Sequence, residues 1–131
     1  MNLYLVSVAL LILHFAALSI LVSVLRVRER TMFGSSLDIQ SWLYRSMRAQ
    51  GNAAEYLAVI VPVLLFFSVA HGDLLAWWFA PLVVATRVLH SLGILLASSM
   101  SKPHVFRAIA GGVTYFILIR MGIVLMTIAM G

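Results

Sequence analysis

The chain has 131 residues, of which 63% are apolar and only 10% are charged, and it contains no cysteine. A soluble domain carries about 25% charged residues, and a disordered segment combines low hydrophobicity with high net charge. The composition excludes both classes and predicts a membrane protein. Without cysteine the chain has no disulfide and no thiolate of its own. The net charge of +5 must be placed relative to a bilayer, and no nucleic-acid partner is expected.

Four apolar stretches are long enough to cross a membrane as helices, which takes about 20 residues. They run over residues 3–25, 45–70, 74–98 and 105–130. Barrel strands would be about 10 residues long and would alternate in polarity, which these stretches do not. The first stretch is longer than the apolar core of a signal peptide and no basic residue precedes it, so we expect it to be retained. The sequence therefore predicts a single all-α domain, residues 1–131, built as a four-transmembrane-helix bundle.

The connections between the stretches differ in charge. Both termini and the turn at residues 71–73 carry no lysine or arginine. The first and third connections, together with the ends of the stretches beside them, carry these basic residues: Arg26, Arg28, Arg30, Arg45, Arg48, Lys102 and Arg107. The positive-inside rule therefore predicts that these two connections lie in the cytoplasm and that both termini lie outside. Several of these side chains would then anchor the topology and contact anionic lipid headgroups.

Ionisable residues inside a span are costly and indicate a functional site by default. Glu55, Arg87 and Arg120 are of this kind, with His14 and His90 as weaker members. His14 stands alone in an apolar stretch, so we expect a neutral ring bonded to a neighbouring helix. For Arg120 the one obvious acidic partner is Glu55, and we expect the two to form a buried structural pair.

A polar stripe opens the second apolar stretch. At 100° per residue its four members fall within about 80° of one another on a helix: Arg45, Arg48, Asn52 and Glu55. Tyr56 lies beside the stripe, and Arg87 and His90 share a face of the third stretch. The stripe has more guanidinium than its one carboxylate neutralises, and guanidinium forks suit carboxylate ligands. It therefore predicts a site for an anion, the alternative being a satisfied polar seam between helices.

Motifs of soluble enzymes are absent from the sequence. It has no phosphate-binding glycine loop, no His-Glu-x-x-His and no serine elbow. The four histidines lack the spacing of metal ligands, so no metal is expected.

Residues 45–56, Arg-Ser-Met-Arg-Ala-Gln-Gly-Asn-Ala-Ala-Glu-Tyr, with Pro62 after them, resemble the second-helix signature of the MAPEG family. These are the membrane-associated proteins of eicosanoid and glutathione metabolism. The family pattern is Arg, two residues, Arg-Ala, two residues, Asn, two residues and an acidic residue, and every fixed position is met. The segment from Arg87 to His90, with Gly93, resembles the third helix of the prostaglandin-synthase branch and of short bacterial members.

The resemblance implies a homotrimer of four-helix subunits that holds glutathione, as co-substrate, near the cytoplasmic face between subunits. The implied glutathione contacts are Arg48, Gln50, Asn52, Glu55, Tyr56, Arg87 and His90. Arg107 resembles the arginine that faces the thiol in the synthase branch and is the implied catalytic residue. The implied activity is that of a transferase or peroxidase acting on lipophilic electrophiles that enter from the bilayer. A bacterial inner membrane is expected rather than an endoplasmic reticulum.

Two other hypotheses fit the same residues. In one, the chain is a non-enzymatic membrane bundle whose polar stripe is structural or binds anionic lipid. In the other it is an ion- or proton-coupled transporter built around Glu55, although four spans without a broken-helix pair argue against this.

Overall fold

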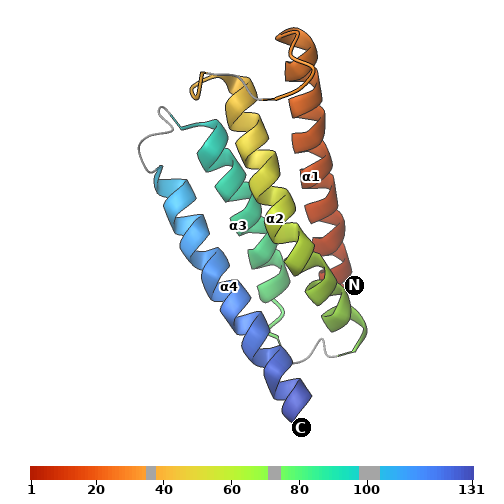
Figure 1. The fold of residues 1–131 in the computed structure, drawn as a ribbon. Helices are drawn as coiled ribbons and strands as arrows, with labels where there is room; N and C mark the ends of the chain where they lie inside the picture. Colours follow the sequence, from red (N-terminus) through yellow and green to blue (C-terminus); the bar gives the residue numbers. More distant parts are fainter. Residues whose placement is uncertain (35–37, 71–74, 98–103) are drawn as a thin grey trace.

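The computed structural model describes residues 1–34, 38–70, 75–97 and 104–131. These residues form an all-helical bundle (Figure 1) of α1 (Leu3–Arg28), α2 (Trp42–Val69), α3 (Phe79–Leu95) and α4 (Val105–Met130). Successive helices run in opposite directions. α1, α2 and α3 pack against one another, and α4 packs on α3 at the edge of the bundle. The predicted turn at 71–73 and the basic residue Lys102 lie outside the described residues.

The predicted set of four helices is confirmed, with one difference in length. α1, α2 and α4 have 26, 28 and 26 residues and are apolar enough to cross a membrane. α3 has 17 residues, about 25 Å of helix, and begins at Phe79 within the predicted stretch 74–98. Pro81 lies in its first turn, where a missing N–H breaks no helical hydrogen bond, so the helix can start only shortly before it.

Polar side chains fix where α1 and α2 begin. The Asn2 side chain accepts hydrogen bonds from the backbone N–H groups of Tyr4 and Leu5. Ser41 does the same for Tyr44 at the start of α2. Both residues satisfy N–H groups that have no partner within their own helix.

The bundle is apolar on its outside as well as its inside. Leu13 and Ile119 are 65% and 63% exposed, while Ile60 and Phe67 are completely buried. Such outward faces suit lipid rather than water. Inside the bundle, His14 Nε2 lies 3.0 Å from Ser91 Oγ on α3, which confirms the expected bond from this histidine to a neighbouring helix.

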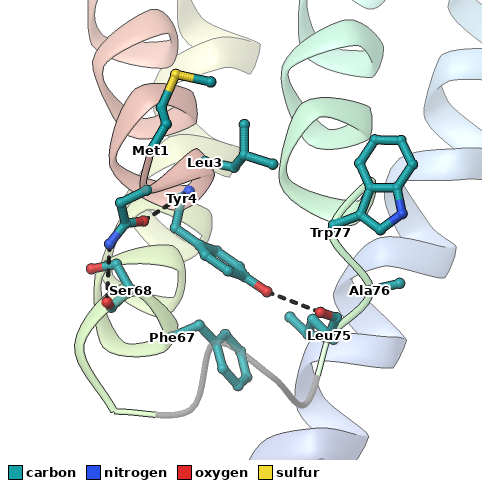
Figure 2. Close-up of a pocket in the computed structure, with 9 residues that line it drawn as sticks. Met1, Leu3, Tyr4, Phe67, Ser68, Leu75, Ala76 and Trp77 are labelled. Carbon is teal, nitrogen blue, oxygen red and sulfur yellow. Dashed lines mark hydrogen bonds between the residues drawn. The ribbon is translucent and has the colours of Figure 1, made fainter.

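The two ends of the bundle differ. The arginine-rich end contains the end of α1, the start of α2, the end of α3 and the start of α4, with Arg26, Arg28, Arg30, Arg45, Arg48 and Arg107. The opposite end contains both termini (Figure 1). There a hollow of about 560 Å³ lies beside Tyr4, whose hydroxyl donates to Leu75 O at 3.2 Å (Figure 2). No lysine, arginine, aspartate or glutamate is among its described lining.

Candidate functional site

Arg87 is the largest completely enclosed side chain in the described bundle, with 1% of its surface exposed. Three helices meet around its guanidinium. Nη2 donates to Oδ1 of Asn52 on α2, and Nη1 donates to Oγ1 of Thr114 on α4 at 3.3 Å. Cζ lies 4.4 Å from the centre of the Tyr56 ring, a cation–π distance. The site therefore brings together three residues predicted from sequence: Asn52, Tyr56 and Arg87.

The partners of Arg87 hold its two terminal nitrogens without neutralising its charge. Asn52, Thr114 and Tyr56 are neutral side chains, and no described carboxylate contacts the guanidinium. Its Nε is buried and has no described partner. Moving a charge out of water costs several kcal/mol unless a counter-charge is present, and Coulomb attraction grows as the effective dielectric falls. The centre of the bundle is therefore a fixed positive charge that favours an anion nearby.

An open groove of about 300 Å³ lies between α3 and α4, towards the arginine-rich end from Arg87. It is lined by His90, Arg107, Ala108, Gly111, Gly112 and Tyr115. His90 Nδ1 is buried and has no described partner. Tyr115 is 59% exposed and lies near Tyr56, whose ring contacts the Arg87 guanidinium. The groove and the buried guanidinium are thus parts of one site, joined by two tyrosines.

Gly93 determines how closely α4 approaches α3 at this groove. A Cβ added to Gly93 would lie 2.7 Å from the backbone N of Arg107 and 3.2 Å from its Cα. Real Cβ atoms essentially never come closer than 3.0 Å to such a neighbour. Only glycine therefore allows the first turn of α4 to lie where it does, and this contact places Arg107 beside His90.

Arg48 and Glu55 lie on the outer face of α2, two turns apart, and both are exposed. Asn52 lies between them on the same side of the helix and turns inward to Arg87. Neither Arg48 nor Glu55 forms an ion pair with any described residue. Both are therefore available to a ligand held against this face.

The expected buried pair of Arg120 with Glu55 is wrong. Both side chains are exposed, and no ion pair joins them. Tyr115 is the residue of α4 that reaches towards α2, and Arg120 follows it by five residues, which is about 140° round the helix. Arg120 consequently lies on a flank of α4 turned away from Glu55.

One residue of the predicted stripe, Arg45, and the implied contact Gln50 join α2 to its neighbouring helices. Gln50 Nε2 donates to Ser19 Oγ on α1 at 3.0 Å, on the side of α2 away from the groove. Arg45 Nη1 donates to the carbonyl of Leu95 at the end of α3, at 3.5 Å. The stripe is therefore partly a seam between helices and partly a free surface.

Thr114 and Tyr115 belong to the site and were not predicted. Thr114 Oγ1 donates to Ala110 O at 2.7 Å and accepts from Arg87, so one hydroxyl serves both groups. A polar Thr-Tyr pair directly after the small residues of an apolar helix was the available signal, because small residues mark close helix contacts in membranes.

Comparison with known proteins gives a match at the level of a family. A sequence model of a protein family, described as the MAPEG family, matches residues 3–127, which is nearly the whole chain. No curated protein and no solved structure matches the chain.

Proposed function

Because the chain belongs to the MAPEG family, we propose that it is an integral-membrane glutathione-dependent transferase or peroxidase acting on lipophilic electrophiles. The observation that carries this proposal is Arg87, a buried guanidinium without a carboxylate, next to an open groove that His90, Arg107 and Tyr115 line. A site with this surplus of positive charge suits a small acidic ligand. Glutathione has two carboxylates, one ammonium and a thiol at neutral pH.

The free groups around the site match that ligand. The Arg48 guanidinium suits a carboxylate, the Glu55 carboxylate suits the ammonium, and Asn52 with Tyr56 can meet the peptide amides. His90 and Arg107 line the groove where the thiol would lie. Gln50, implied as a further contact, supports the site from the α1 side through Ser19.

The chemistry needs a thiolate, because the thiolate and not the thiol is the nucleophile. A cation beside the sulfur stabilises the charged form, starting from a free-thiol pKa of about 8.5, and each unit of lowering corresponds to about 1.4 kcal/mol. In conjugation the thiolate sulfur forms a bond to an electrophilic carbon, which releases its leaving group. In peroxidase chemistry the thiolate sulfur attacks one peroxide oxygen, the O–O bond breaks, and the other oxygen takes up a proton and leaves as an alcohol. The thiol of a second glutathione then attacks the sulfur of the resulting sulfenic acid, which forms the disulfide and releases water. Arg107 is proposed to face the sulfur.

The apolar outside of the bundle gives the second reactant its route. A lipophilic electrophile partitions into the bilayer and reaches the groove laterally, while glutathione arrives from water at the arginine-rich end. Holding two reactants from different phases together lowers the barrier by proximity. We propose that the arginine-rich end is cytoplasmic, that both termini lie outside, and that the membrane is a bacterial inner membrane. The proposed assembly is a homotrimer with glutathione between subunits.

Calorimetric titration of the purified protein with glutathione tests the proposal. Wild-type protein should bind, and Arg48→Gln or Glu55→Gln should weaken binding about tenfold, the effect of losing one charge-assisted hydrogen bond. Both residues are exposed, so assembly should survive. Arg120→Gln is the matched control, since it removes an exposed guanidinium from the flank of α4 that is turned away from Glu55. Absence of binding heat with wild-type protein would overturn the proposal.

The seam formed by Gln50 and Arg45 favours the second candidate, a non-enzymatic bundle whose polar stripe is structural. Thermal melts in detergent separate the two. The transferase proposal requires glutathione to raise the melting temperature, whereas a structural stripe makes glutathione irrelevant and makes Arg45→Gln destabilising.

A further inference from the structure

A second hollow at the arginine-rich end shares no residue with the candidate site. It has a volume of about 530 Å³ and lies between the end of α1 and the start of α2. Its lining residues are Leu21, Leu25, Arg28, Glu29, Ser41 and Trp42. None of the reaction steps proposed above uses these residues.

The hollow changes from apolar to polar along the direction of α1. Leu21, Leu25 and Arg28 follow one another at the spacing of a single helix face. Leu21 lies about 10 Å deeper along α1 than Arg28, at 1.5 Å per residue. Trp42 lies at the start of α2 and is 54% exposed. Tryptophan is enriched at the interface between hydrocarbon and water, so we place Trp42 at this interface. The hollow thus has an apolar inner wall and a polar mouth. This matches the apolar acyl chains and the polar headgroup of a single phospholipid.

The mouth carries both signs of charge. Arg28 and Glu29 are exposed neighbours, and neither forms an ion pair with any described residue. Ser41 caps the N-terminus of the 28-residue α2, so the positive end of that helix also lies at the mouth. A ligand that fits this arrangement has a phosphate for Arg28 and the helix end, and a cation for Glu29.

We propose that this hollow binds a phospholipid whose headgroup bears a primary ammonium. The phosphate lies between Arg28 and the start of α2, the ammonium donates to the Glu29 carboxylate, and an acyl chain follows Leu21 and Leu25. Phosphatidylglycerol has no cation in its headgroup and so offers nothing to Glu29. A choline headgroup carries a cation without an N–H group to donate.

Native mass spectrometry of the protein released from bilayers containing equal amounts of phosphatidylethanolamine, phosphatidylcholine and phosphatidylglycerol of one acyl composition tests this. The wild-type protein should retain phosphatidylethanolamine over the other two by about tenfold, the worth of one hydrogen bond to a charged group. Glu29→Gln should abolish the preference over phosphatidylcholine while lipid is still retained. Arg28→Gln should reduce retention of all three lipids.

Two further variants keep the test sharp. Arg30→Gln removes the same charge two residues away, outside the hollow, and should leave retention unchanged. Leu21→Trp fills the apolar wall without changing charge and should lower retention of phosphatidylethanolamine. Equal retention of the three lipids by the wild-type protein would overturn the proposal, as would an equal loss in Arg30→Gln and Arg28→Gln, because general surface charge would then explain the binding. Glutathione is absent from every arm, so the result is independent of the proposed enzyme activity.

Discussion

Replacing Gly93 by alanine tests whether the contact between α3 and α4 positions Arg107, the proposed catalytic residue. The new Cβ would lie 2.7 Å from the backbone N of Arg107, and ordinary contact begins at 3.4 Å. The neighbour is backbone, which cannot rotate away as a flexible side chain can. The first turn of α4 must therefore withdraw by about 0.7 Å, and Arg107 moves with it.

The expected effects on stability and on activity differ in size. Overpacking costs about 1–3 kcal/mol, and the better helix propensity of alanine offsets up to about 1 kcal/mol of that. A misplacement of about 1 Å at a reacting centre can cost about a hundredfold in rate. We therefore expect Gly93→Ala to lower kcat about tenfold or more while the melting temperature falls by a few degrees.

Initial rates of glutathione conjugation to a lipophilic aryl halide, with thermal melts alongside, give both quantities. Gly122→Ala is the matched control, since a Cβ added at this glycine of α4 meets no atom within 4 Å, and its activity should equal that of the wild-type protein. A Gly93→Ala variant that keeps kcat within twofold of the wild-type value would refute the positioning role. Inactive wild-type protein would refute the proposed function instead.

Three further predictions concern the buried network and its surroundings. Thr114→Val keeps the shape of the side chain but removes a buried hydrogen bond to Arg87, so reversible unfolding in mixed micelles should show a loss of about 2 kcal/mol; an unchanged stability would contradict the bond. A double-mutant cycle on His14→Ala and Ser91→Ala should give a coupling of about 0.6 kcal/mol, typical of hydrogen bonds between membrane helices, and no coupling would argue against the contact. Raising the ionic strength from about 0.05 to 0.5 M should reduce the effect of Arg48→Gln on glutathione affinity, because the attraction between exposed charges is screened; an undiminished effect would mean that Arg48 is buried in the complex.

The number and approximate bounds of the helices could be predicted from the sequence because spans of a membrane protein are set by length and apolarity. α4 follows the predicted stretch 105–130 in this way. Which side of α4 faces the bundle could not be predicted. Lipid accepts apolar side chains as readily as the protein interior does, so residues on both sides of the helix are apolar and periodicity carries little signal. This is why Thr114 was missed and Arg120 was paired incorrectly.

The candidate site was predictable where one helix carries it. The spacing of Arg48, Asn52 and Glu55 already places them on one side of α2. The division of the stripe between structure and free surface depends on tertiary neighbours. Arg45 bonds the Leu95 carbonyl because α3 packs on α2 there, and a single sequence does not show which helix lies against that side.

A guanidinium can be held in place by hydrogen bonds to neutral groups and still keep its charge, and the site depends on this. Arg87 donates to neutral oxygens of Asn52 and Thr114, so it is held in place yet keeps its full charge in a medium of low dielectric. Had Glu55 turned inward to pair with it, the centre of the bundle would be neutral, and an acidic ligand would have to break an ion pair before binding. With Glu55 on the outer face instead, the positive charge at the centre is preorganised for an anion, and the carboxylate is left free for a cation on the same ligand.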